Sequence, residues 1–140
     1  MQASDIESLV DLAIELWPDH SWEEMAGEMA PLLAAEDAAV FGWQEGGRWE
    51  AFAQCQLRRD YVEGCETSPV GYLEGIFVRE PLRGKGVARA LLTACQTWAR
   101  EQGCREFASD CELSNEDSLR FHLATGFQEA GRIICFVKQL

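Results

Sequence analysis

The chain has 140 residues, of which 47% are hydrophobic and 26% charged, enough apolar material for the core of one domain of ordinary size. No stretch approaches the roughly 18 consecutive apolar residues of a membrane-spanning helix, and the first residues lack the basic and apolar regions of a signal peptide. The formal net charge of −12 disfavours nucleic acid and anionic lipid as partners. We therefore expect a cytoplasmic, single-domain protein (residues 1–140) without nucleic-acid or membrane partners. Its acidity either suits a cationic ligand or serves solubility only.

The cysteines do not form a recognisable metal or redox motif. None of them are spaced as C-x-x-C, and the chain has only 2 histidines, so no metal site is predicted. We expect reduced thiols, several of which fill apolar positions.

Two amphipathic helices are predicted first. One runs from Ser4, which forms a capping-box pattern with Glu7, to Trp17, where the following proline ends it. The second begins after Ser21 and runs to about residue 35.

A β-hairpin and a buried strand are predicted next. Strands at 38–44 and 49–61 are joined by Glu45-Gly46-Gly47-Arg48, in which glycine supplies the positive φ that a tight turn needs. A loop containing glycine and proline leads to a strand at 71–78.

The second half alternates helices with strands. The strongest helical periodicity lies at 87–102 and ends at Gly103. A short strand is expected at 105–109, a helix at 115–125 and a last strand or hairpin at 127–137. A strand–helix–strand unit implies parallel strands joined by a right-handed crossover, so the sequence predicts a mixed-sheet α/β domain.

A glycine-rich basic turn precedes the longest helix. Gly84 and Gly86 allow the backbone to approach a ligand closely, and the first turn of the helix offers unpaired N–H groups at its positive dipole end. Arg83, Lys85 and Arg89 add positive charge in an acidic protein. This context predicts a pyrophosphate site rather than a connection without a ligand. The spacing matches neither a P-loop nor a G-x-G-x-x-G turn.

This turn, read as Arg83-x-x-Gly86-x-Ala88, resembles the acetyl-CoA signature of the GNAT acyltransferases. Asn115 and Gly126-Phe127 resemble their downstream helix and final strand. Other segments resemble the aminoglycoside 6′-N-acetyltransferases more narrowly: residues 16–20, 59–64, 67–70, 73–78 and 107–110.

The resemblance implies a GNAT-like fold, with a central, mostly antiparallel sheet that contains a parallel, splayed strand pair and is flanked by helices. It also implies acetyl-CoA as cosubstrate, an aminoglycoside as acceptor and a homodimer. The residues that it assigns to acetyl-CoA are Ile76, Phe77, Val78, Arg83, Gly84, Lys85, Gly86, Val87, Ala88, Arg89 and Asn115. Ile76 to Val78 would pair with the pantetheine arm as an added strand.

The resemblance assigns the acceptor to a set of aromatic and acidic residues: Trp17, His20, Tyr61, Glu74 and Asp110. Carboxylates pair with ammonium groups, and aromatic faces accept cations or sugar C–H faces. Strand alternation would put Glu74, Ile76 and Val78 on one face. Asp110 would end the neighbouring strand, although it could instead cap a turn.

Glu74 or Asp110, acting through water, is the expected proton acceptor, with positioning of the amine mattering more than basicity. His122 stands where many GNAT enzymes have a tyrosine that protonates the leaving thiolate. Histidine can donate a proton at neutral pH, but the acid could also be water. Gly131 replaces a substrate-binding glutamate of some relatives, and the chain opens with a helix where GNAT folds usually open with a strand.

Alternative functions remain open at this point. The acceptor could be a polyamine or a protein amine, or the chain could be an acetyl-CoA-binding module without catalysis. The acidic candidate residues favour a polycationic acceptor, whereas His122 in the tyrosine position favours the non-catalytic module.

Overall fold

The computed structural model describes residues 1–140, and its elements follow the predicted order up to the last helix. In chain order they are η1 (Ala3–Asp5), α1 (Ile6–Leu16), α2 (Trp22–Ala34), β1 (Ala38–Glu45), β2 (Arg48–Arg58), β3 (Val70–Val78), η2 (Glu80–Leu82), α3 (Val87–Glu101), β4 (Phe107–Ser109) and α4 (Glu116–Ala124). No helix combines the length and the apolar character that a membrane crossing requires.

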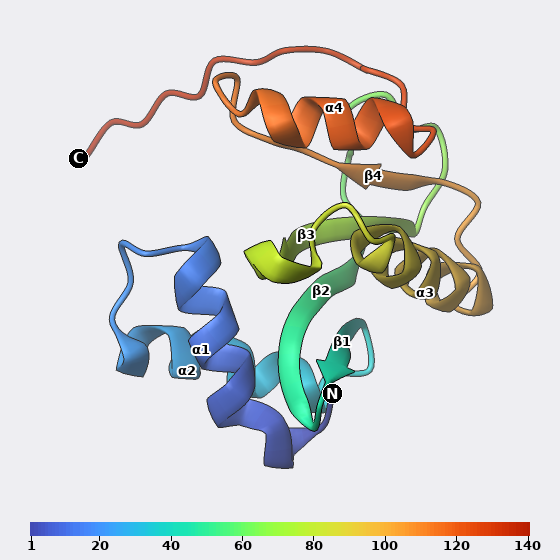
Figure 1. Ribbon diagram of the computed structural model, residues 1–140. Helices are drawn as coiled ribbons and strands as arrows, with labels where there is room; N and C mark the ends of the chain where they lie inside the picture. Colours follow the sequence, from blue (N-terminus) through green and yellow to red (C-terminus); the bar gives the residue numbers. More distant parts are fainter.

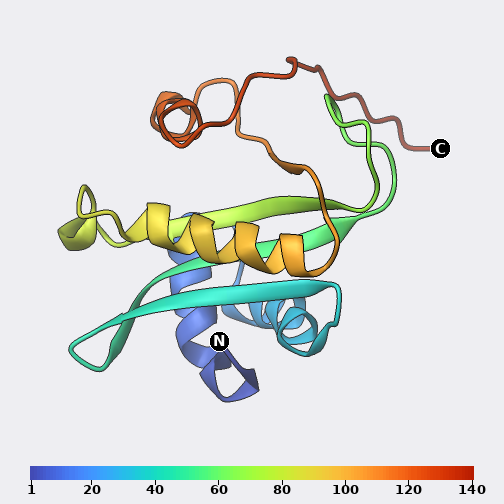
Figure 2. The same cartoon turned by 90° about the vertical axis from the view of Figure 1, so that its right-hand side faces the viewer.

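The strands form one sheet in the order β1-β2-β3-β4, and α3 covers one face while α1 and α2 cover the other (Figures 1 and 2). Neighbouring strands are antiparallel except β3 and β4, which are parallel. The predicted mixed sheet, mostly antiparallel with one parallel pair, is therefore confirmed.

Small residues on β2 allow α3 to pack closely on the sheet. Ala51, Ala53 and Cys55 are fully buried beneath Leu91 and Leu92 of α3. Burial of such apolar surface contributes roughly 25 cal/mol per Å². This face of the sheet holds α3, and with it the turn before α3, in a fixed position.

The opposite face joins α1 and α2 to the sheet through a separate apolar cluster that includes Leu9, Leu12, Met25 and Phe52. Arg79, directly after β3, adds ion pairs to Glu15 of α1 at 2.7 Å and to Glu50 of β2 at 3.0 Å. These contacts anchor the end of α1 beside β3.

Of the N-terminal caps predicted for the first two helices, only the second is present. Ser21 caps α2, and its hydroxyl accepts a hydrogen bond from Glu24 N–H at 3.2 Å while Glu24 accepts from Ser21 N–H at 2.8 Å. The prediction that Ser4 caps the first helix is wrong, because Ser4 lies inside η1. Asp5 instead accepts a hydrogen bond from Gln2 N–H, so the 3₁₀ turn precedes the α-helix.

Two predicted strands differ from the structure. β2 ends at Arg58, before the predicted end at Tyr61, because the chain turns into the loop that leads to β3. The predicted strand or hairpin at 127–137 is absent: residues 127–140 form no regular secondary structure, and from residue 128 onward every residue is exposed. Residues 127–137 pair with none of the four strands, and an apolar pattern alone does not form a strand without such pairing.

A β-bulge interrupts the pairing of β2 with β3. Gln54 pairs with Gly75 and Cys55 pairs with Leu73, so Glu74 is the additional residue on β3. Leu73, Ile76 and Val78 therefore all pack toward α3, and Glu74 points to the other face. The predicted common face of Glu74, Ile76 and Val78 is wrong, because a bulge reverses the alternation of side chains.

Candidate active site

The β3–β4 pair is splayed because β4 is short. Only Gly71, Tyr72 and Leu73 of β3 pair with β4, whereas the rest of β3 pairs with β2 alone. The backbone from Glu74 to Val78 thus presents an open edge that an extended amide chain could join. One acceptor on this edge is already used, because Arg83 Nε donates to the Val78 carbonyl at 2.7 Å.

The basic turn leads directly from this open edge into α3. Gly84 and Gly86 have φ values of 74° and 83°, which favour glycine, and a Cβ at either position would meet no atom within 4 Å. The space around the turn is therefore open. Gly86 is the N-cap of α3, and the N–H groups of Val87, Ala88 and Arg89 have no backbone partner. Together they form an anion-binding end of the helix.

A cavity of about 290 Å³ opens over this turn. Its wall on the far side comes from α4, so the cavity lies between the turn and the last helix. Its lining residues are Val78, Leu82, Arg83, Gly84, Gly86, Val87, Ala88, Arg89, Phe121, Ala124 and Thr125. An apolar cavity with a basic, N–H-rich mouth fits the pantetheine and pyrophosphate parts of coenzyme A.

The arginines of the turn are held by neighbouring elements. The guanidinium of Arg83 lies 5.7 Å from the centre of the Phe77 ring. Arg89 Nη2 donates to the Ala124 carbonyl at 3.1 Å and so joins α3 to the end of α4. Both arginines line the cavity, whereas Lys85 is exposed and lies outside its lining.

Asn115 has a structural role at the start of α4. It is the N-cap of α4, and its Oδ1 accepts a hydrogen bond from Ser118 N–H at 3.1 Å. It does not line the cavity over the turn.

Glu74 faces an arginine on the neighbouring strand, because both residues lie on the side of the sheet opposite α3. Arg58 Nε donates to Glu74 Oε1 at 2.9 Å, and Arg58 Nη2 donates to Oε2 at 2.8 Å. Both carboxylate oxygens are therefore engaged in a bidentate pair. The Glu74 side chain is only 19% exposed, so this pair is partly shielded from water.

Asp110 belongs to the same cluster through Tyr72. The Tyr72 hydroxyl donates to Asp110 Oδ2, and the Arg58 guanidinium lies 3.4 Å from the centre of the Tyr72 ring. Burial, together with the hydrogen bond to Asp110, raises the pKa of Tyr72 well above its usual value, so its phenol stays protonated. The hydroxyl is therefore a permanent donor to Asp110, which is itself exposed.

His122 of α4 reaches the end of β4. Its Nδ1 lies 2.7 Å from the Ser118 carbonyl, which can only accept, so the Nδ1 proton is donated there. Its Nε2 lies 2.8 Å from Ser109 Oγ, which is also 3.3 Å from the Leu73 carbonyl. The imidazole is thus joined through Ser109 to the point where β3 and β4 separate.

The aromatic residues predicted for the acceptor are less tightly grouped. The Trp17 ring packs on β3 so closely that a Cβ at Gly75 would fall 2.5 Å from it, and this position is next to Glu74. His20 is exposed in the connection between α1 and α2. Tyr61 is 79% exposed in the loop before β3, and its hydroxyl donates to Glu63.

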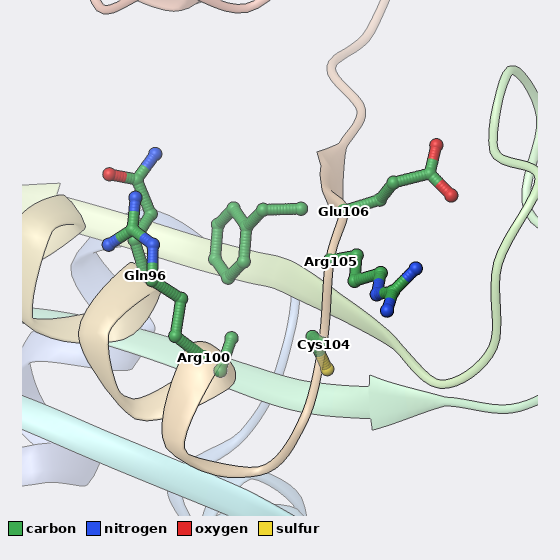
Figure 3. Close-up of a pocket in the computed structure, with 7 residues that line it drawn as sticks. Gln96, Arg100, Cys104, Arg105 and Glu106 are labelled. Carbon is green, nitrogen blue, oxygen red and sulfur yellow. The ribbon is translucent and has the colours of Figure 1, made fainter.

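A second, smaller hollow of about 80 Å³ lies at the other end of α3, beside β4 (Figure 3). Its walls include Gln96 and Arg100 of α3 and the segment from Cys104 to Phe107. It is far smaller than the cavity over the turn and lies at a helix C-terminus, where the dipole disfavours anions. The larger cavity is therefore the better cofactor site.

The fold and the turn together define an acyltransferase of the GNAT type. The model of the acetyltransferase (GNAT) family matches residues 6–127, and the chain belongs to this family.

Similar proteins are known by sequence and by structure. The chain is 42% identical to an aminoglycoside N(6′)-acetyltransferase type 1 of Serratia marcescens, and the match covers 97% of this chain and 94% of that protein. It is 41% identical to an aminoglycoside N(6′)-acetyltransferase type 1 of Stenotrophomonas maltophilia, and this match covers 95% of this chain and 86% of that protein. A solved structure of the aminoglycoside N-acetyltransferase AAC(6′)-Iy with CoA superimposes with a TM-score of 0.96 at 38% identity, covering 100% of this chain and 92% of that chain. A second AAC(6′)-Iy structure, with the bisubstrate analogue CoA-S-monomethyl-acetylneamine, gives a TM-score of 0.95.

Four residues of the site are not indicated by the sequence patterns: Arg58, Tyr72, Ser109 and Phe121. Arg58 follows an apolar strand and resembles an ordinary strand end. Its partner Glu74 is distant in sequence, and the strand register that brings them together has no local signal. Only Ser109, adjacent to Asp110, could have been suggested by its position at the end of a strand.

Proposed function

We propose that the protein transfers the acetyl group of acetyl-CoA to the 6′-amine of an aminoglycoside and thereby confers aminoglycoside resistance. The observation that carries the proposal is the acidic cluster of Glu74 and Asp110 beside the splayed strand edge. Relatives with this activity in their names, at 34% to 42% identity across most of their length, support it. The residues 1–140 would act as one GNAT domain.

The acetyl-CoA site would extend from the open edge of β3 to the turn. Ile76, Phe77 and Val78 would lie along the pantetheine arm, and Gly84 to Arg89 would hold the pyrophosphate. The free N–H groups at the start of α3 and the guanidinium of Arg83 support this assignment. Lys85 and Asn115 are proposed as outer contacts, because neither lines the cavity over the turn.

The acceptor would bind on the other side of the splayed edge, against the acidic cluster. Glu74 and Asp110 would bind ammonium groups, and Trp17 would supply an aromatic wall beside Glu74. His20 and Tyr61 would contact the outer rings, because their loops are exposed.

The chain supplies positioning and proton transfer, while acetyl-CoA supplies the activated acetyl thioester. Glu74 or Asp110, through water, would take a proton from the acceptor ammonium. The neutral amine would then add to the thioester carbonyl and form the C–N bond, and a backbone N–H of the open β3 edge would stabilise the resulting oxyanion. As the carbonyl forms again, the C–S bond would break and its electron pair would leave with sulfur.

His122 and Ser109 would return a proton to the departing sulfur. A protonated imidazole would give its Nε2 proton to Ser109 Oγ, and the hydroxyl would pass its own proton on. The 2.8 Å contact between Nε2 and Oγ supports such a relay. The nitrogen would lose its second proton to the acidic cluster as the amide forms. Of the two protons lost by the ammonium, one would restore the proton that the imidazole gave to sulfur, and the other would be released to solvent, so that protons balance.

The experiment measures thiol release from acetyl-CoA with an aminoglycoside that carries a 6′-amine, with a matched compound that has a 6′-hydroxyl instead, and with a polyamine. We expect rapid release with the first compound only. Release with the polyamine alone would reassign the acceptor. Binding of acetyl-CoA without release for any amine would indicate the non-catalytic module.

We also propose that the protein is a homodimer. Large apolar side chains of residues 127–140 are exposed to a degree that is unusual for a monomer, Phe136 at 91% and Val137 at 94%, and β4 is an unpaired sheet edge. A second copy of the chain would cover both. Sedimentation of the intact chain should give twice the monomer mass, and Phe136→Asp should shift it toward the monomer.

For location and other partners, we propose the cytoplasm, where acetyl-CoA is available, and neither nucleic acid nor membrane. The net charge of −12 supports the second proposal, because such a charge repels polyanions.

A further inference from the structure

We infer that Arg58 is a built-in counter-cation of the acceptor site, a positioning residue that prevents the acidic cluster from holding the proton on the attacking amine. The inference rests on the proposed function and concerns how the same site reconciles two opposing demands. The acids must attract a polycation, yet the nitrogen that attacks must be neutral.

The geometry shows that Arg58 is a fixed part of the cluster. Its guanidinium holds both oxygens of Glu74, at 2.9 and 2.8 Å, and lies flat enough on Tyr72 for its Cζ to be 3.4 Å from the ring centre. Tyr72 in turn donates to Asp110. A chain of contacts therefore joins the two acids through the arginine and the tyrosine.

The strand register makes this pairing possible. Arg58 pairs with Val70 and Cys55 pairs with Leu73, and Cys55 and Leu73 both pack toward α3, so Arg58 and Tyr72 lie on the opposite face. Glu74, two residues after Tyr72, lies on that same face by ordinary alternation. The bulge that follows changes the side of Ile76 and Val78, which pack toward α3.

The groups that face Arg58 are Glu74, Tyr72 and Asp110. Partial burial of Arg58 opposes its charge, but the hydrogen bonds and attraction of Glu74 raise its pKa above the usual value, so the guanidinium stays charged. Tyr72 stays neutral because its pKa is also raised. With both acids ionised, the cluster carries one net negative charge in place of two.

The smaller negative charge of the cluster affects the pKa of the acceptor amine. A carboxylate within about 4–6 Å favours the charged form of a neighbouring group and moves its pKa by roughly 1–3 units. An ammonium between two unpaired carboxylates would therefore bind tightly and keep its proton. Arg58 neutralises one of these charges before the acceptor arrives, so that the amine is held but can still be deprotonated.

The test compares the wild type with Arg58→Met, Arg58→Gln and Arg58→Lys. Methionine keeps an apolar stem against Tyr72, glutamine keeps a donor toward Glu74 without charge, and lysine keeps the charge. For each protein the pH dependence of kcat and KM for a 6′-amino aminoglycoside is measured between pH 6 and 10, together with the protons released on binding by calorimetry in buffers of different ionisation enthalpy.

We expect the uncharged variants to have an equal or lower KM and a kcat about 10-fold lower at neutral pH, with the midpoint of the kcat–pH profile shifted upward by roughly one unit. Their kcat should recover at high pH, and fewer protons should be released on binding. Arg58→Lys should restore most of the wild-type profile. Thermal unfolding confirms that each variant is folded.

The matched control is Arg59→Met. Arg59 is the next residue, with a side chain 63% exposed and only a distant pair to Asp37 at 4.0 Å. The substitution Arg59→Met should leave both the kcat–pH profile and the KM for the aminoglycoside unchanged.

The outcomes separate this inference from the proposed function. Suppose that the wild type is active but the uncharged variants lose kcat equally at all pH values, or that their KM rises while the midpoint of the kcat–pH profile stays unchanged. Arg58 then serves structure only, and the inference fails while the proposed function stands. If the wild type neither binds nor acetylates an aminoglycoside, the proposed function fails and the inference falls with it.

Discussion

At the scale of single residues, the acceptor side of the site contains one polar group that the fold leaves without a partner. Gln54 lies on β2 opposite Gly75, next to the bulge, and is 7% exposed. Its Oε1 is buried and accepts no hydrogen bond. An unsatisfied buried acceptor costs roughly 1–3 kcal/mol.

Gln54→Met should therefore increase the free energy of unfolding by about 1 kcal/mol, because it replaces the unpaired amide with an apolar chain of similar length. Urea denaturation measures this change. Gln56→Met, on the same strand and partly exposed, should have no effect. A loss of stability in Gln54→Met would show that the amide has a partner in solution.

Two glycines in open surroundings should respond oppositely to the same substitution. Gly86→Ala forces a side chain into φ 83° and should destabilise the protein by about 1–2 kcal/mol while raising KM for acetyl-CoA. Gly27→Ala, in the middle of α2 where a Cβ meets nothing, should stabilise it by about 0.5–1 kcal/mol. Equal effects of the two substitutions in denaturation would contradict the role assigned to the left-handed turn.

At the scale of elements, the loop between β2 and β3 is tied to the start of β4 by one carboxylate. Glu106 Oε1 accepts hydrogen bonds from the Thr67 hydroxyl and from the N–H groups of Glu66 and Thr67. These hydrogen bonds lower the pKa of Glu106 below its ordinary value of 4.5, and the bond from the Thr67 hydroxyl has the largest effect.

The stability from this contact should depend on pH in a defined direction. Because the pKa is lowered by folding, the contribution is complete above 4.5 and is lost as the pH falls through the lower, folded-state value. Wild type should be more stable than Glu106→Gln at pH 7, and the difference should shrink as the pH is lowered below 4.5. Glu101→Gln, at the exposed end of α3, is the control and should show no such trend.

At the scale of the whole molecule, the charge of −12 provides long-range attraction for a polycation. Since salt screens such attraction over about 10 Å at 0.1 M, kcat/KM for an aminoglycoside should fall several-fold between low and high ionic strength. KM for acetyl-CoA, an anion, should stay constant or decrease. A kcat/KM that is independent of salt would show that only local contacts attract the acceptor.

The order of the elements up to α4, the glycine-rich turn that ends at Gly86 and the family could be predicted from the amino-acid sequence alone. Each of these rests on residues that are close together in the chain. Periodicity and turn chemistry are local, and the structure confirms them from Ser21 at the start of α2 to Ala124 at the end of α4, within a few residues at each boundary. The family's candidate acids, Glu74 and Asp110, could also be chosen from the sequence.

The contacts of those two acids follow from the three-dimensional arrangement of the strands and could not be predicted from the sequence. The bulge at Glu74 depends on the register between β2 and β3, and the partners Arg58 and Tyr72 come together through that register. The failure of the predicted strand at 127–137 has the same origin. Strand pairing and side-chain partnership depend on residues far apart in sequence, so no local pattern can specify them.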